Sequence, residues 1–153
     1  MNRAILTHLK AKLILPPQLK DDGDLAGNLA FDLAGLDAAL ILLGVGVTDI
    51  DLGSGAEDVP VYLEECDTES ATPGDWVKIT GSDIAEVVQD DDDGKLIGWF
   101  IDKTKTRKRY VRIHEPHSGN GTTGANACAI AIGLPDIAPV TAAQMGLKQL
   151  VQL

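Results

Sequence analysis

The chain has 153 residues and a mass of 16.2 kDa, the size of one ordinary domain, with 44% hydrophobic and 24% charged residues. These proportions exclude wholesale disorder, and a formal net charge of −10 excludes broad, non-specific binding to a phosphate backbone. Cys66 and Cys128 lie far apart and belong to no metal-spaced cluster, so the sequence predicts neither a disulfide scaffold nor a zinc site.

Sixteen glycines and seven prolines punctuate the chain closely, and aromatic residues make up only 4% of it. This composition favours many short strands joined by turns over a few long helices. The longest apolar run, Ala38 to Val47, has ten residues, whereas a membrane-spanning helix needs about twenty. Basic and polar residues interrupt the apolar amino terminus, which therefore does not match an export signal. We expect no membrane span and a soluble protein that is made inside the cell.

The first predicted element is an amino-terminal arm over residues 1–20. Pro16 and Pro17 prevent a helix from continuing and favour an extended exit from this segment. The stretch "AILTHLKAKLIL" is too apolar to stay in water. It therefore packs either on its own domain or on another chain, and the sequence leaves both possibilities open. The main domain is expected over residues 21–140.

Alternating and continuous apolar patterns predict the strands of that domain. Ala38 to Val45 is a candidate buried strand, and Val59 to Cys66 alternates as a half-buried strand. The short strand "WVKIT" follows a turn, and the segments "KLIGWFID" and "KRYVRIHE" are expected to pair as an antiparallel hairpin. The basic link "KTKTR" would be the exposed tip of this hairpin. Val111 and Ile113 are expected to point into the core.

The last predicted strand is the small-residue segment "ACAIAIGL", which follows a glycine-rich loop from His117 to Asn126. Thr141 and Gln144 have the spacing of a capping box, so residues 141–153 are expected to form a short helix or a second arm. A total of about seven strands predicts an all-β fold. We expect a single β-sandwich or jelly-roll-like domain with an extended amino-terminal arm and a short carboxyl-terminal arm or helix.

Charge is distributed along the chain in blocks. From Asp49 to Asp102 there are sixteen acidic residues and two basic ones, whereas Lys103 to Arg112 contains six basic residues and no acid. A basic segment in an acidic protein has three interpretations: a nucleic-acid contact, a solvated strand edge, or one half of a charge-complementary protein contact. The acidic partner in the third case is the chain's own acidic face or that of a neighbouring copy.

Motifs for catalysis or metal binding are missing from the sequence. Residues 90–93 are four aspartates, but with Gly94 at the sixth position of a calcium loop, Gln89 and Phe100 occupy ligand positions that need oxygen-rich side chains. An exposed, self-repelling turn is the preferred interpretation. The three histidines lie in no motif that recruits a nucleophile. The glycine-rich segment from Gly44 to Gly55 lacks the third glycine of a dinucleotide-binding fingerprint. We predict no enzymatic activity, no cofactor and no metal site.

Several blocks of sequence together resemble a group of small tailed-phage virion proteins encoded next to the major capsid protein. The blocks are "LKAKLILPPQ", "DLAGLDAALILLGVG", "VPVYLEECD", "KRYVRI" and "AIAIGLPDIAPV", and they span most of residues 9–140. The resemblance implies a β-sandwich that coats a capsid as a cement or decoration protein, or that lies at the head-to-tail neck. The resemblance carries over positions in the sequence only. The motif "KRYVR" corresponds to Lys108 to Arg112, and the closing prolines correspond to Pro135 and Pro139. The basic link and the carboxyl-terminal "MGLKQLVQL" depart from the pattern.

We therefore expect a capsid cement or decoration protein in the virion, which binds the assembled major capsid protein and itself, a trimer being favoured. The alternatives are a head-tail neck or tail component, and a nucleic-acid-binding module that uses residues 103–112, although the net charge disfavours direct DNA contact. Partner-facing residues are expected in the first arm, the basic link and the carboxyl-terminal end. They are Leu6, Leu9, Leu13, Leu15, Lys103, Lys105, Arg107, Lys108, Arg109, Leu147, Leu150 and Val151.

Overall fold

Eight β-strands make up most of the described chain, and no α-helix occurs in that part of it. The computed structural model describes residues 9–20, 29–48, 61–70, 72–84, 94–114 and 125–135. The strands are β1 (Lys10–Lys20), β2 (Phe31–Asp32), β3 (Leu36–Thr48), β4 (Tyr62–Cys66), β5 (Val77–Lys78), β6 (Leu96–Asp102), β7 (Tyr110–His114) and β8 (Ala125–Pro135), and a 3-10 helix spans Pro73–Asp75. The prediction of an all-β fold is confirmed.

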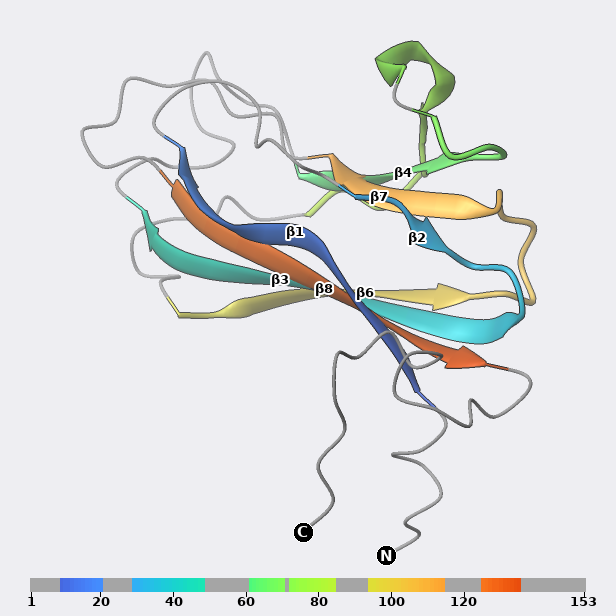
Figure 1. Cartoon of the computed structure of the whole chain (residues 1–153), viewed down its shortest axis with the longest axis horizontal. Coiled ribbons are helices and arrows are strands. Elements are labelled where there is room, and N and C mark those ends of the chain that lie inside the picture. Colours follow the sequence, from blue (N-terminus) through green and yellow to red (C-terminus); the bar gives the residue numbers. More distant parts are fainter. Residues whose placement is uncertain are drawn as a thin grey trace, which may run out of the picture.

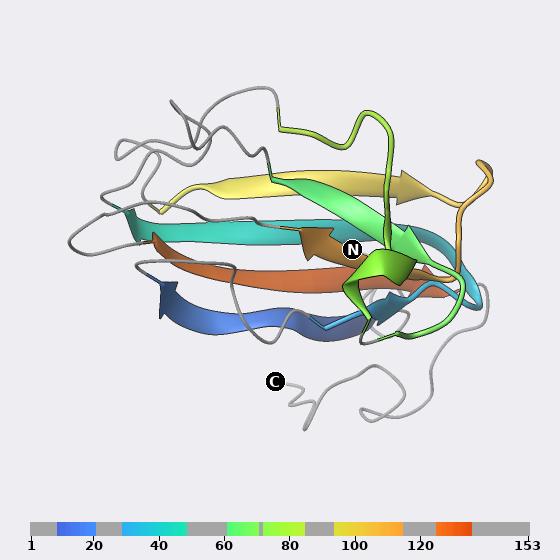
Figure 2. The same ribbon diagram turned by 90° about the horizontal axis from the view of Figure 1, so that it is seen from above.

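The strands form two four-stranded antiparallel sheets that face each other (Figure 1). Sheet A has the order β1-β8-β3-β6, and sheet B has the order β2-β7-β4-β5. From above, the strands of sheet A lie side by side, with β1 and β6 at opposite edges (Figure 2). The pairing is nested along the chain, because β1 pairs with β8, β2 with β7, β3 with β6 and β4 with β5. This β-sandwich has the strand order of a jelly roll.

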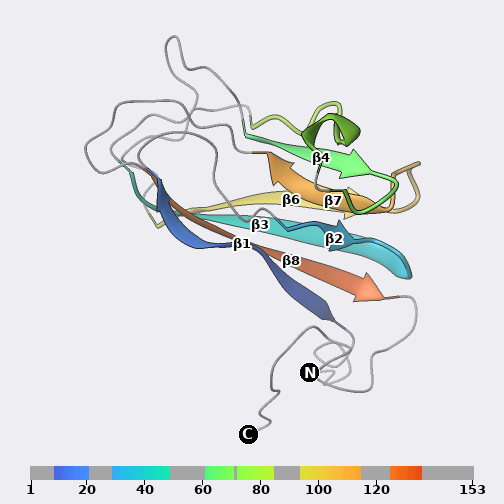
Figure 3. The ribbon, with the colours of Figure 1, turned by 45° about the horizontal axis from the view of Figure 1, so that its top comes forward.

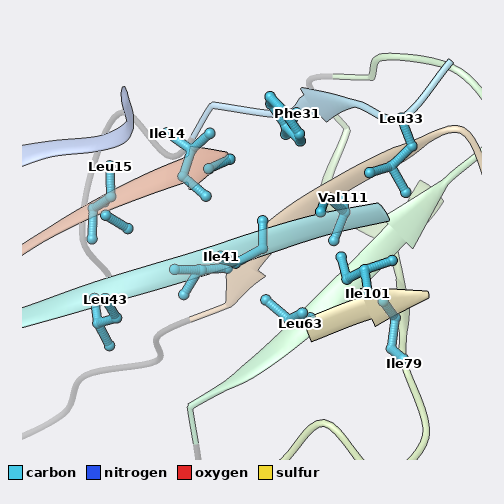
Figure 4. Close-up of a cluster of buried hydrophobic side chains, with 14 of the residues drawn as sticks. Ile14, Leu15, Phe31, Leu33, Ile41, Leu43, Leu63, Ile79, Ile101 and Val111 are labelled. Carbon is cyan, nitrogen blue, oxygen red and sulfur yellow. The ribbon is translucent and has the colours of Figure 1, made fainter. Parts of the chain in front are cut away.

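The core lies between the sheets and consists of inward-facing side chains from both (Figure 4). Ile41 and Leu43 of β3 and Ala129 of β8 are fully buried from sheet A, and Val111 and Ile113 of β7 are fully buried from sheet B. Successive side chains of a strand point to opposite faces, so these residues share a face with their alternate neighbours. The prediction that Val111 and Ile113 point into the core is confirmed.

Gly133 of β8 makes room for two larger side chains in this core. A Cβ atom at this position would lie 2.6 Å from Cδ1 of Leu36 and 3.1 Å from Cζ of Phe31. These two side chains come from strands of different sheets. The missing side chain at Gly133 therefore lets sheet A and sheet B pack to the density that a protein interior requires.

A tight turn joins β2 in sheet B to β3 in sheet A. The carboxylate of Asp32 accepts a hydrogen bond from the backbone N–H of Ala34 at 2.9 Å, and Leu36 N–H donates to the carbonyl of Leu33 at 3.2 Å. Gly35 has a φ of 68°, a left-handed conformation that glycine adopts without a steric penalty. This turn holds the Asp32 side chain at the end of β2.

The predicted hairpin between the last two strands before the glycine-rich loop is wrong. Both segments form strands, but β6 pairs with β3 in sheet A and β7 pairs with β4 and β2 in sheet B. The link from Lys103 to Arg109 consequently passes from one sheet to the other (Figure 1). Each strand has a regular inward-facing apolar side, and placing the strands in opposite sheets buries Ile101 and Val111 in one core.

The predicted amino-terminal arm also needs a correction, because its described part is a strand of the domain. Residues 10–20 form β1, which pairs with β8 along its length. The register shifts between Leu13 and Leu15, so that Ile14 and Leu15 are both buried in the core. Apolar residues of this segment therefore pack on their own chain. The predicted second arm or helix, residues 141–153, lies outside the described residues.

Core packing at Ile41 is expected to dominate the stability of the sandwich. Replacing Ile41 by alanine should lower the free energy of unfolding by about 2–5 kcal/mol, since the side chain is fully buried and the sheets can close the resulting cavity only in part. Val77→Ala on the exposed strand β5 should change it by about 0.5 kcal/mol or less. Urea unfolding followed by circular dichroism measures both values, and equal losses would contradict this assignment of the core.

Candidate functional site

The outer face of sheet A, which points away from sheet B, carries apolar side chains across all four strands. Residues directly opposite each other in an antiparallel sheet share a face, and the register defines two apolar rows across this one. One row is Leu13, Ile130, Leu42 and Gly98, and the other is Ala11, Ile132, Leu40 and Phe100. Beside them lie Ala38 and Leu134, which pair with each other. We call these residues the apolar outer face.

Several large side chains of the apolar outer face are exposed to solvent. Leu13, Leu40, Phe100, Ile130 and Leu134 each expose about a third or more of their surface. Single exposed apolar residues are common on proteins, but a continuous patch that crosses a whole sheet marks an interaction site. The geometry of this face is that of a broad sheet surface, which suits contact with another protein surface better than capture of a small molecule.

The outer face of sheet B is different, because it carries polar and charged side chains. Tyr62 of β4 lies opposite His114 of β7, and Glu64 lies opposite Arg112. The Tyr62 and His114 rings stack at 4.6 Å between their centroids. The 3-10 helix lies on this side of sheet B (Figure 3), and Trp76, which follows it, packs in a small cluster with Cys66. Only sheet A therefore presents a broad apolar surface among the described strands.

Glu64 and Arg112 form the least exposed ion pair of this polar face. Arg112 Nε donates to Glu64 Oε2 at 2.9 Å and its second nitrogen lies 2.8 Å from the same oxygen, with side-chain exposures of 17% and 10%. The Arg112 guanidinium also lies over the Trp76 ring at 4.3 Å, and His114 Nδ1 lies 3.4 Å from Glu64 Oε1. Arg112 is thus committed to contacts inside the chain and is not available to a partner.

Arg109 also has its partner within the chain, because it forms a bidentate ion pair with Asp32. Its Nε donates to Asp32 Oδ1 at 3.0 Å and its terminal nitrogen donates to Oδ2 at 2.8 Å. These hydrogen bonds lower the pKa of Asp32, with a smaller contribution from the backbone N–H of Ala34, and they raise the pKa of Arg109. The contact joins the start of β7 to β2. Lys108 likewise lies 3.7 Å from Asp67, and its backbone N–H donates to Glu65 at 3.2 Å.

The other basic side chains, Lys103, Lys105 and Arg107, form no ion pair with any described residue. They lie on the inter-sheet link directly after β6, where the Asp102 carboxylate accepts a hydrogen bond from the backbone N–H of Thr104 at 2.8 Å. That bond lowers the pKa of Asp102. These three cations are the part of the basic segment that has no ion-pair partner among the described residues, and we call them the basic link.

The basic link borders a groove along the open side of the sandwich. The groove has a volume of about 470 Å³ and lies between β6 of sheet A and residues 79–82, which follow β5 of sheet B. Lys105 and Arg107 line it together with Trp99 and Phe100. Trp99 spans the two sides, since its indole Nε1 donates to the carbonyl of Ser82 at 2.7 Å.

The predicted interface residues separate into three groups in the structure. Leu13 lies on the apolar outer face, Leu9 is partly buried just before β1, and Leu15 is buried in the core, which corrects the expectation that it faces a partner. Lys105 is exposed and Lys103 and Arg107 are partly buried, and none of the three pairs with a described carboxylate, whereas Lys108 and Arg109 pair with carboxylates of the same chain. The remaining residues lie outside the described part of the chain: Leu6, Leu147, Leu150 and Val151.

Sequence reasoning missed the apolar outer face itself, above all Leu40, Ile130, Leu134 and Phe100. The signal was present, because β3 and β8 carry apolar residues at both odd and even positions, "AALILL" and "ACAIAIGL". Such continuous apolar strands are typical of sheets that are covered on both faces. The apolar run predicts a strand buried inside one domain, whereas sheet B covers only one of its faces.

No group of three or more histidine, cysteine or acidic side chains with metal-binding geometry occurs among the described residues. Both cysteines are free thiols, Cys66 buried and Cys128 partly buried. None of the helices in the described ranges has the length and hydropathy that a bilayer crossing requires.

Comparison with protein families, with curated proteins and with solved structures finds no match for this chain.

The Asp32–Arg109 contact should make stability depend on pH in the acidic range. The folded pKa of Asp32 lies below its ordinary value of 3.8. The ionised Asp32 carboxylate therefore stabilises the folded protein at pH values above 3.8. This stabilisation is lost as the pH falls through the folded pKa of Asp32. Asp32→Asn should destabilise the protein at about pH 7 and have little effect near pH 2. Urea unfolding at both pH values measures the difference, and an equal effect of Asp37→Asn, at an exposed position, would contradict the assignment.

Removing Arg112 should be more damaging, because it leaves the Glu64 carboxylate nearly buried without its cation. We expect Arg112→Met to lower the free energy of unfolding by about 3 kcal/mol. The double variant Glu64→Leu/Arg112→Met should regain most of the loss, since no buried charge then remains. Denaturant titrations of both variants test this, and a double variant as unstable as the single one would refute it.

Proposed function

We propose that this protein is a non-enzymatic virion protein of a tailed phage, of the capsid cement or decoration type. Its apolar outer face would lie against the assembled shell of the major capsid protein and stabilise contacts between capsomers. It would be located in the capsid of the virion after synthesis in the host cytoplasm.

The observation that carries this proposal is the contrast between the two outer faces. An antiparallel sheet with one covered face commonly directs polar residues toward water on the other. Sheet B follows this rule with Glu64, Arg112 and His114, whereas sheet A presents Leu40, Ile130 and their apolar neighbours. A partner that covers sheet A would remove this apolar area from water, at roughly 25 cal/mol per Å² buried.

The shape and charge of the surface favour a protein shell as the partner. A broad sheet face fits a broad protein surface, and a stable contact of standard size buries roughly 1,600 Å² in total. Lys103, Lys105 and Arg107 lie at the end of β6, at the border of this face, where they can meet carboxylates of a partner. Charges at a border of this kind guide orientation and association more than they add affinity.

The identity of the shell comes from the sequence resemblance to small tailed-phage virion proteins. A jelly roll occurs in viral capsid proteins, but also in lectins and cupins, so the fold by itself does not select a function. Polar contacts of Lys108, Arg109 and Arg112 inside the chain leave only half of the basic segment for a partner. This distribution supports a protein contact over a nucleic-acid contact.

Capsid binding should depend on the apolar outer face. Purified protein mixed with empty expanded capsids of the same phage should co-sediment with them, and Leu134→Lys should reduce the bound fraction by about tenfold or more, because binding would bury an unpaired charge. The matched control is Val77→Lys, since Val77 is exposed to 51%, against 43% for Leu134, but lies on sheet B.

Two outcomes contradict the proposal. One is a Leu134→Lys protein that still co-sediments as fully as the unmodified protein. The other is a native virion that contains only a handful of copies of this chain, which would indicate the neck or tail position instead.

A further inference from the structure

The four edges of the two sheets are not equally protected against pairing with another strand. In sheet B, the edge strands β2 and β5 have only two residues each. In sheet A, β1 carries two register shifts and the prolines Pro16 and Pro17. Short strands, bulges and prolines are the devices by which proteins prevent edge-to-edge association. The fourth edge, β6, has seven residues in unbroken register with β3 and none of these devices.

The backbone of β6 has N–H and C=O groups along this edge that bond to no described residue. Val45 N–H donates to the carbonyl of Lys95 at 3.0 Å, and Lys103 N–H donates to the carbonyl of Asp37 at 3.2 Å. Because bonding direction alternates along an antiparallel strand, the odd-numbered residues of β6 bond to β3 and the even-numbered ones point away. The N–H and C=O groups of Gly98 and Phe100 therefore point outward, and no described residue bonds to them.

The side chains of the same edge are apolar and open to solvent. Phe100 exposes 72% of its surface and Leu96 exposes 68%, the largest values for bulky hydrophobic residues in the described chain. They lie on one face of the strand and flank Gly98, since successive even-numbered residues share a face. A strand added at this edge would cover both of them.

Charge along the sequence indicates which strand fits. Four aspartates, residues 90–93, precede Gly94 directly, and the basic link follows β6. In an antiparallel pair of two β6 strands, the beginning of one lies beside the end of the other. The sequence next to β6 is acidic at one end and basic at the other, which makes β6 complementary to a second copy of itself.

We propose that two copies of this chain associate through their β6 edges as an antiparallel, two-fold symmetric dimer. Gly98 of each copy lies at the symmetry axis, and Leu96 of each copy lies opposite Phe100 of the other. The contact is isologous, as expected for a closed dimer, and it supplies about six backbone hydrogen bonds. It joins the two copies of sheet A into one continuous sheet. This inference does not depend on the proposed capsid function, and it replaces the trimer that the sequence favoured with a dimer.

Molar mass in solution tests the contact directly. Sedimentation equilibrium of the full chain should give twice the 16.2 kDa of one chain. Phe100→Lys should give the mass of a single chain with an unchanged circular dichroism spectrum, because the side chain is mostly exposed and its loss leaves the core intact. The control Leu134→Lys should remain dimeric, since Leu134 lies on β8 in the interior of the sheet.

A cysteine at the symmetry axis tests the register. In a hydrogen-bonded antiparallel pair the Cα atoms lie about 5.5 Å apart, within the range of about 4.4–6.8 Å that a disulfide spans. A Cβ atom at Gly98 would lie 3.4 Å from Cδ2 of Leu42, an ordinary contact, so cysteine fits there. Gly98→Cys should form a covalent dimer on mild oxidation, whereas Gly74→Cys and the unmodified protein should not.

The proposal is overturned by a monomeric or trimeric mass for the unmodified protein. It is equally overturned if Phe100→Lys stays dimeric while Leu134→Lys dissociates, because the copies then associate through the apolar outer face. Failure of Gly98→Cys to cross-link in a protein of dimeric mass would exclude this register.

Discussion

The burial of one face of sheet A against sheet B is the interaction on which the rest of the structure depends. The inward side chains of β3, such as Ile41 and Leu43, fill the space above the small alanines of β8. Gly133 has no side chain, and this leaves room in the core for Leu36 of sheet A and Phe31 of sheet B. Both central strands of sheet A are apolar on either side, and sheet B covers only one of these two faces, so no described strand covers the other.

Half of the cations in the basic segment pair with carboxylates of the same chain, on or next to sheet B, and are not left for a partner. Arg109 and Arg112 each hold a carboxylate from a neighbouring strand of sheet B, Asp32 on β2 and Glu64 on β4. β7 lies between β2 and β4 in sheet B, so these two ion pairs join the β7 segment to both of its neighbours within one chain. The basic link, by contrast, lies where the chain leaves sheet A, beside the exposed strand β6. The proposed dimer would double the width of the apolar outer face.

Much of the fold could be predicted from local pattern. The alternation around Val111 and Ile113 and the apolar run from Ala38 to Val45 correspond to strands because side chains alternate across a sheet with a period of two residues. The hairpin prediction failed because alternation indicates which side of a strand is buried, but not which strand lies beside it. Leu15 was misassigned for a related reason: a single register shift turned it into the core together with Ile14.

By itself, the sequence determined the all-β class, the positions of the main strands and the segregation of acidic and basic residues. These properties follow from residue type and local spacing, which need no knowledge of distant neighbours. Only the tertiary structure decided that β6 and β7 belong to different sheets, that half of the basic segment is paired inside the chain, and that no described strand covers the outer apolar face of sheet A. Each of these depends on contacts between residues that are far apart in the chain, because an apolar residue is buried or exposed according to what lies across from it.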